Sequence, residues 1–158
     1  MQQQLSVVLL RHTQPVLDML RDTILTCPAD VFAGDKILVR EHLYHAMVGM
    51  DIWLSYSPQD YPLSDIADLP AAQLQKIAPA TFSREFLLAY VGKLETKLNA
   101  LPVESSQLLE KRDMDGHEIT FLDQCLIQIR HVQHHLGEID EIMRSHGKPL
   151  LKWKGYGG

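Results

Sequence analysis

The sequence predicts an all-α protein, a single domain over residues 1–158 built as an antiparallel four-helix bundle. Apolar residues recur at helical spacing along four long stretches, and no convincing polar–apolar alternation indicates strands. A chain of 158 residues suits one domain with a substantial core. Long helices with one long crossover are typical of such bundles.

The first predicted helix covers about residues 5–26. Pro15 lies inside it, so we expect a bend or a split there, because proline removes a backbone hydrogen bond and clashes with the preceding turn. The pair Cys27-Pro28 ends the helix, since a residue before proline disfavours helical geometry. The predicted core residues of this helix are Val8, Leu9, Val16, Leu20, Ile24 and Leu25.

The second predicted helix runs from about residue 35 to residue 56, and Asp35 suits its N-cap position. The long crossover follows. Four prolines between residues 57 and 79 exclude one long helix but permit short turns, for instance around residues 71–77.

The third predicted helix spans about residues 81–100 and is closed by Pro102. A polar connection follows, which ends in a turn signal at residues 113–116.

The fourth predicted helix covers about residues 120–147. Thr120 and Asp123 resemble a capping box, with aspartate in place of the usual glutamate. Gly147 suits the position just past the helix end, and Pro149 follows shortly after it.

The charge balance excludes several function classes. A formal net charge of -5 argues against general attraction to nucleic acid or to anionic membranes. The N-terminus lacks the order of a signal peptide, and no apolar run approaches the roughly 20 residues that span a bilayer. We therefore expect a cytoplasmic protein that binds neither nucleic acid nor membranes.

The two cysteines, Cys27 and Cys125, do not form a CxxC motif, so a reduced pair is the simpler interpretation. Cys125 falls on an apolar helical face and is expected to be a small core residue.

Three histidines, His131, His134 and His135, lie close together on the fourth predicted helix. The apolar arc of this helix consists of Cys125, Val132, Leu136, Ile139, Ile142 and Met143. On a helical wheel, His135 lies roughly 40° and His131 roughly 80° from the centre of that arc, whereas His134 lies roughly 140° away. His131 and His135 should therefore face the edge of the core one turn apart, while His134 should face solvent or a partner.

A third imidazole is expected from the second predicted helix. His45 shares an angular sector with Leu38 and Ile52 and should point inward, whereas His42 is less well placed but not excluded. Asp51 falls on the side of Arg40 and is expected to be a surface charge.

Together, His45, His131 and His135 are the candidate ligands of an open, three-histidine site for a divalent metal, with zinc and nickel the favoured ions. A water bound to such an ion can become a nucleophile near neutral pH. The simpler alternative is that these histidines are core or interfacial residues with ordinary hydrogen bonds. Glu138 could serve as a general base, although the pattern around it is not HExxH. The sequence therefore assigns no catalytic residue.

Two segments resemble one known family. Residues 41–54 resemble the second helix of DinB-like proteins, in which a ligand histidine precedes an aromatic–aliphatic pair by about two turns. Residues 131–139 are similar to the fourth-helix signature of that family, H-x-x-H-H-R-G-Q. The chain departs from this signature at Leu136, where arginine is common, and at Glu138, where glutamine is common. The departures leave the ligands intact, but they put in doubt any substrate or dimer contact made by the usual arginine.

The resemblance covers nearly the whole chain and implies an up-up-down-down four-helix bundle with a long crossover between its second and third helices. It also implies that His45, His131 and His135 bind a divalent metal. Members of the family resemble metal-dependent hydrolases, thiol-dependent S-transferases and isomerases, so the resemblance does not identify which reaction this chain would catalyse.

Two functions therefore follow as expectations. The first is a metal-dependent hydrolase or thiol S-transferase that acts on a small-molecule substrate, such as a thiol. The second is a non-catalytic binding or dimerisation bundle with no functional metal. A homodimer is compatible with either.

Overall fold

The structure, a computed structural model, describes residues 3–32, 39–54, 82–101, 105–114, 116–149 and 151–155. These residues are mostly helical. The helices are α1 (Gln3–Thr26), α2 (Ala29–Phe32), α3 (Val39–Trp53), α5 (Arg84–Asn99), α6 (Ser105–Leu108) and α7 (Phe121–Ser145). The strands β1 (Lys111–Met114) and β2 (His117–Thr120) form a small antiparallel hairpin.

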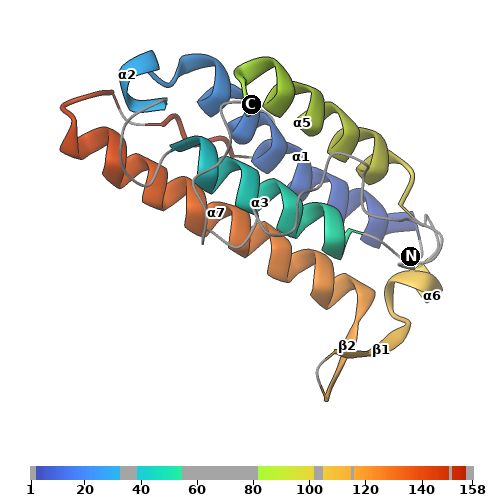
Figure 1. The fold of residues 1–158 in the computed structure, drawn as a ribbon. Helices are drawn as coiled ribbons and strands as arrows, with labels where there is room; N and C mark the ends of the chain where they lie inside the picture. Colours follow the sequence, from blue (N-terminus) through green and yellow to red (C-terminus); the bar gives the residue numbers. More distant parts are fainter. Residues whose placement is uncertain are drawn as a thin grey trace.

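The four long helices α1, α3, α5 and α7 lie side by side, with the hairpin projecting at one end (Figure 1). Each packs mainly on two of the others, in the cyclic order α1, α5, α3, α7, and α1 and α3 also make a smaller contact. The first turn of α5 lies beside the end of α1, where Arg84 donates to the carbonyl oxygens of Ile24 and Cys27. The two helices are therefore antiparallel.

The other helix directions follow from two further contacts. His42, early in α3, lies beside Glu138, late in α7, so α3 and α7 are antiparallel. Asp51, late in α3, contacts Lys97, late in α5, so α3 and α5 are parallel. Hence α1 and α7 run one way, and α3 and α5 run the other (Figure 1).

The expected up-up-down-down order is therefore wrong, because in chain order the long helices run up, down, down, up. Helical periodicity shows which face of a helix is buried, but it does not show which neighbour covers that face or in which direction it runs. The turns predicted near residues 71–77 fall within residues 55–81, the segment of sequence between α3 and α5. They lie outside the described residues.

One hydrophobic core lies among the long helices. Tyr44, Tyr90 and Phe121 are among its largest fully buried side chains. Tyr44 of α3 stacks on Phe82 just before α5, with ring centroids 4.1 Å apart, which fixes one end of the α3–α5 pair.

The first predicted helix is confirmed in extent, with two corrections. α1 is continuous through Pro15, so of the bend or split expected there, the split does not occur. Val8 and Leu25, expected in the core, are exposed at 43% and 58%. On a helical wheel Val8 and Leu25 lie roughly 120° and 140° from the buried Leu20, outside the buried face of the helix.

The start of α7 is confirmed as a capping box. The Thr120 hydroxyl accepts from the Asp123 backbone N–H, and the Asp123 carboxylate accepts from the backbone N–H of Thr120. At the other end, Gly147 has φ +65°, which suits the residue just past a helix. The predicted N-cap at Asp35 lies outside the described residues.

The hairpin was not expected from the sequence. Its strands pair Lys111 with Thr120 and Met114 with His117. These short strands are largely polar and exposed, so they carry no alternating apolar pattern. The predicted turn signal does fall between them, where Gly116 has φ +81° and its N–H is 3.3 Å from an Asp113 carboxylate oxygen.

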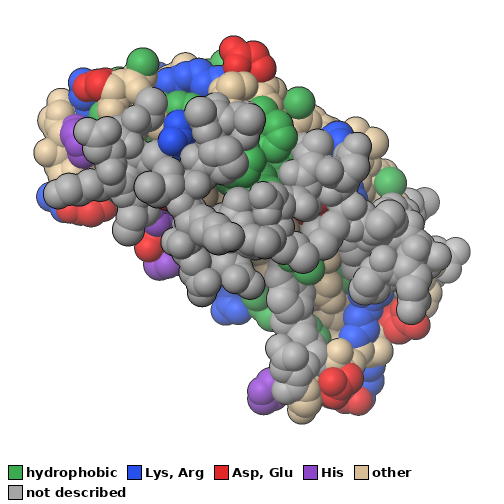
Figure 2. All heavy atoms as spheres, in the orientation of Figure 1, with side chains coloured by type: hydrophobic (Ala, Val, Ile, Leu, Met, Phe, Trp, Pro, Cys, Tyr) green, Lys and Arg blue, Asp and Glu red, His purple; other side chains and the backbone are tan. Residues whose placement is uncertain are grey.

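No helix among the described residues is both long and apolar enough to cross a bilayer. On the face shown in Figure 2, acidic and basic side chains are interspersed over the described surface. Cys27 and Cys125 are both free and buried, as expected for a reduced pair with Cys125 in the core.

Candidate metal centre

The antiparallel contact between α3 and α7 brings the three predicted ligands together. His131 Nε2 lies 3.1 Å from His45 Nε2 and 3.0 Å from His135 Nε2. The ring centroids are 4.5–5.0 Å apart in each pair, and the rings meet edge to face. Three imidazoles from two helices thus direct the same ring nitrogen toward one point.

The separations suit a single ion. Nitrogens bound at about 2.0–2.1 Å in a tetrahedral arrangement lie roughly 3.4 Å apart, so a small outward shift of the rings would admit a zinc-sized ion. Neutral imidazole is a ligand for zinc, nickel, copper and iron alike, so this donor set does not choose among them.

The surroundings favour neutral rings. His135 is buried, while His45 and His131 are half-buried. Burial, with the neighbouring rings of His131 and His45, lowers the pKa of His135 to about 4. Burial, with the neighbouring ring of His45, also lowers the pKa of His131. Near neutral pH these rings are uncharged, so each has one unprotonated nitrogen for a metal.

Gly49 makes room for His131 on the facing helix. A Cβ at residue 49 would lie 2.7 Å from Cε1 and 2.9 Å from Nδ1 of His131. Real Cβ atoms essentially never approach other atoms so closely. The absence of a side chain at position 49 therefore lets α3 and α7 approach closely enough for the imidazoles to meet.

Two buried polar atoms lie near this contact. Gln128 Oε1 and His131 Nδ1 have no hydrogen-bond partner in the described part of the chain. Both lie within 3.4 Å of the Cβ position of Gly49. When Nε2 of a histidine binds a metal, Nδ1 keeps its proton and needs an acceptor. The unpaired amide oxygen of Gln128 is an acceptor in the right neighbourhood.

A second cluster lies on the opposite edge of the His135 ring. Glu138 Oε2 is 2.6 Å from His135 Nδ1 and 3.2 Å from His42 Nδ1, and the two nitrogens are 3.3 Å apart. Burial lowers the pKa of His42, although Glu138 opposes this. Burial raises the pKa of Glu138, but the nearby rings of His135 and His42 outweigh it, so the net shift is downward.

This cluster changes the roles expected for two residues. His42 was less well placed on the helical wheel, yet its side chain is buried against His135. Glu138 was considered as a general base, but it contacts the Nδ1 edge of His135, away from the point where the three Nε2 atoms meet. The sequence signal for the cluster is the i, i+3 spacing of His135 and Glu138.

Two other predictions have opposite outcomes. His134 is exposed, as the helical wheel predicted, and its Nε2 is 3.5 Å from Glu138 Oε1. Asp51, expected at the surface, is instead only 3% exposed. Its carboxylate accepts a hydrogen bond from the Tyr90 hydroxyl and forms an ion pair with Lys97, and both partners lie on α5. A polar side chain can be buried when another helix supplies its partners, which a single-helix wheel cannot show.

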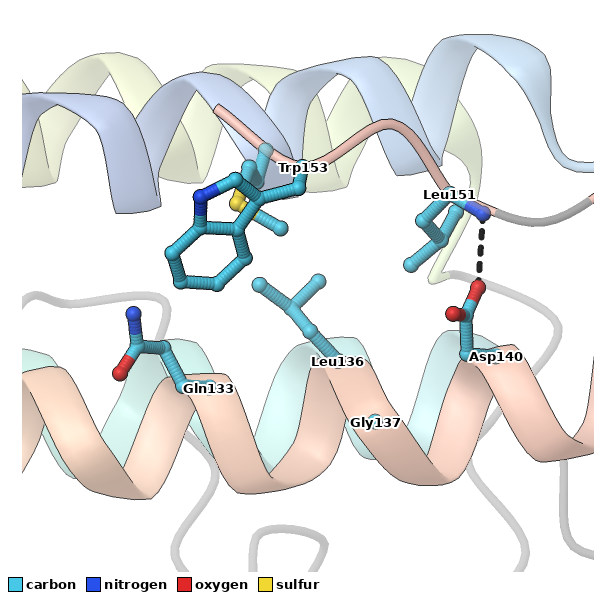
Figure 3. Close-up of a pocket in the computed structure, with 7 residues that line it drawn as sticks. Gln133, Leu136, Gly137, Asp140, Leu151 and Trp153 are labelled. Carbon is cyan, nitrogen blue, oxygen red and sulfur yellow. Dashed lines mark hydrogen bonds between the residues drawn. The ribbon is translucent and has the colours of Figure 1, made fainter. Parts of the chain in front are cut away.

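Three cavities lie along the seam between α1 and α7, next to residues 151–155. They have volumes of about 160, 430 and 410 Å³; the first two share Met19 and Leu151, and the first and third share Trp153. In the smallest, Trp153 and Leu136 extend into the space between α7 and the tail, and Leu151 N–H donates to Asp140 (Figure 3). None of the three is lined by the candidate ligands.

Comparisons with family models, curated proteins and solved structures found no match for this chain.

Proposed function

We propose that this chain is a DinB-like, metal-dependent enzyme with an up-down-down-up four-helix bundle. In this proposal His45, His131 and His135 bind a divalent ion, zinc or nickel, and the protein acts on a small molecule as a hydrolase or a thiol S-transferase. The convergence of the three Nε2 atoms on one point, from two separate helices, is the observation that supports it.

A divalent ion with three protein ligands keeps a coordination position open and lowers the pKa of a water or thiol bound there. The protein's part is to hold the three imidazole rings in position. Packing of α3 on α7 sets their separation, Gly49 lets His131 approach, and burial keeps His135 unprotonated. Because the folded protein already holds the three histidine side chains close together, they do not have to be ordered when the ion binds, and this favours affinity.

The first test is the metal content of protein purified without chelators and then reconstituted with zinc or nickel. We expect at least about one equivalent in the wild type and a large loss in the double variant His131→Ala/His135→Ala. The matched control is His134→Ala, which removes an exposed imidazole from the same helix turn and should keep its metal. Less than about a tenth of an equivalent in the reconstituted wild type would contradict the proposal.

A metal-free binding bundle is the second candidate. The observation that favours it is that the three cavities described above lie along α1 and α7 and are not lined by the candidate ligands. In that case, replacing His45, His131 and His135 by asparagine or leucine leaves folding and binding unchanged. Zinc and nickel would then fail to raise the melting temperature, whereas an ion at one hundred times its Kd adds about 2.7 kcal/mol to a protein that binds it only when folded.

A substrate screen separates the reaction classes. Ester and amide substrates test hydrolysis, and low-molecular-weight thiols with an electrophilic acceptor test S-transfer. Either activity should disappear in His131→Ala/His135→Ala and persist in His134→Ala.

A further inference from the structure

We propose that His42, His135 and Glu138 form a second divalent-cation site and that the His135 ring bridges the two ions. The first ion would bind at Nε2 of His135 and the second at Nδ1. This inference rests on the proposed metal centre, because the bridge needs an ion at each edge of the ring.

The geometry of the second cluster resembles that of the first. Its ligand atoms are His42 Nδ1, His135 Nδ1 and Glu138 Oε2, separated by 3.3, 3.2 and 2.6 Å. The two longer separations are close to the roughly 3.4 Å expected between ligands of one tetrahedral ion. The shortest involves Glu138, whose side chain is 39% exposed and can move outward to receive an ion.

The carboxylate oxygen of this cluster lies between the two ring nitrogens. Glu138 Oε2 is buried and lies 2.6 Å from Nδ1 of His135 and 3.2 Å from Nδ1 of His42, and the carboxylate is hydrogen-bonded to both rings. A cation at the centre of the cluster would replace these hydrogen bonds by coordination to Oε2 and both nitrogens.

The nitrogen ligands are also well enclosed. His42 is 7% and His135 is 5% exposed, so water contributes little to their hydrogen bonding. The rings of His42 and His135 are 5.5 Å apart and tilted, which directs their Nδ1 atoms toward the same oxygen. Two imidazoles and one carboxylate suit zinc, copper or nickel rather than magnesium or calcium, which prefer oxygen ligands alone.

The proton balance of the bridge is simple. A neutral imidazole has one unprotonated nitrogen and one N–H group. When the second ion binds, the Nδ1 proton of His135 leaves to solvent, and the ring becomes an imidazolate with a lone pair at each edge. The negative charges of that imidazolate and of the Glu138 carboxylate offset part of the charge of the two cations.

The first experiment counts bound ions. Metal-free protein is loaded with excess zinc, desalted and analysed for metal. We expect two ions per chain in the wild type and in the exposed control His134→Ala. Glu138→Gln and His42→Asn should each retain one ion, because the three Nε2 ligands stay in place. His45→Asn should also retain one ion, held by the second cluster.

The second experiment detects the bridge itself through Cu²⁺. Two Cu²⁺ ions joined by one imidazolate couple their unpaired electrons, so the paramagnetic resonance signal should rise up to one equivalent of copper and then fall toward two. In Glu138→Gln the signal should rise to one equivalent and show no such fall. A signal from two independent ions at two equivalents would overturn the bridge.

The variants separate failure of this inference from failure of the proposed function. Suppose that the wild type binds one ion, which is lost in His45→Asn and kept in Glu138→Gln. That result would overturn the second site but leave the three-histidine centre intact. Glu138 would then be a hydrogen-bond acceptor that orients His135. If the wild type instead binds one ion that is lost in Glu138→Gln and kept in His45→Asn, the three-histidine centre is overturned and the bridge with it. No bound ion in the wild type would overturn both.

Discussion

The imidazole of His131 fills the space that a side chain at Gly49 would need, since a Cβ there would lie 2.7 Å from His131 Cε1. The proposed metal centre thus depends on a residue that supplies no ligand. Glycine in the middle of a helix costs roughly 0.5–1 kcal/mol relative to alanine. At position 49 the glycine is needed despite this cost, because a side chain there would prevent the close approach of α3 and α7.

Gly49→Ala is therefore expected to displace the His131 ring and to weaken metal binding about 10- to 100-fold, the range seen when the groups that orient a metal ligand are changed. Gly92→Ala is the matched control, because a Cβ at residue 92 of α5 meets no atom within 4 Å. That variant should gain about 0.5–1 kcal/mol of stability and keep its metal affinity. Calorimetric titration with zinc measures the affinities, and equal affinities in the two variants would contradict the prediction.

Asp51→Ala is expected to destabilise the fold by about 3–5 kcal/mol, because it leaves the Lys97 ammonium without its carboxylate partner in a buried setting. The contrasting variant is Glu118→Ala, which removes an ion pair with Lys111 in which both side chains are about two-thirds exposed. That change should cost less than about 1 kcal/mol. Urea unfolding measures both, and similar losses would show that Asp51 has no special role.

Thr120→Ala is expected to cost about 1 kcal/mol, because it removes the hydroxyl that caps the first turn of α7. Thr96→Ala serves as the control. Its hydroxyl only donates back to the Gly92 carbonyl on an exposed helix face, so the change should be close to neutral or slightly stabilising. Thermal unfolding in the presence of a chelator separates this effect from metal binding.

The same cap should weaken in acid. Hydrogen bonds from Thr120 lower the pKa of Asp123, so the folded state favours the ionised carboxylate. Its contribution is present above the unfolded pKa of about 3.9 and is lost as the pH falls through the lower folded value.

The metal-free protein is expected to lose stability as the pH falls from about 6.5 toward 4. The unfolded His135 binds a proton near pH 6.5, whereas in the folded state its pKa is lowered to about 4, chiefly by burial. Between these values the unfolded state binds more protons, so the free energy of unfolding decreases with falling pH, by up to about 1.4 kcal/mol per pH unit for one proton.

Urea titrations at several pH values between 7 and 4, with chelator present, measure this slope. His135→Asn should show a shallower dependence, whatever its absolute stability. An unchanged slope in that variant would mean that His135 does not carry the effect.

Local sequence patterns predicted much of this molecule. The helix faces of α7 follow from its periodicity, which put His131 and His135 at the core edge and His134 outside. The capping box at Thr120 and the glycine at 147 depend on hydrogen bonds and backbone angles within a few residues. Such features need no distant partner, so a short stretch of sequence is sufficient to predict them.

Other features depend on contacts between helices and could not be read from a single stretch. Burial of Asp51 requires Lys97 and Tyr90 on α5, and the pairing of His42 with Glu138 requires α7 opposite α3. The hairpin before α7 has no apolar pattern to reveal it. The directions of α3 and α7 relative to α1, which were taken from the family resemblance, were predicted incorrectly, and the residue pattern could not correct them because an amphipathic helix can pack either way along its neighbours.

The sequence by itself thus determined the helical class of this protein, the inward-facing histidines and the ends of α7, because these follow from the spacing of residues along one helix. Only the tertiary structure decided the up-down-down-up order, the close approach of His131 to Gly49 and the Glu138 cluster beside His135. These arise when helices remote in sequence pack together, and the free energy of that packing belongs to the whole core rather than to any one segment.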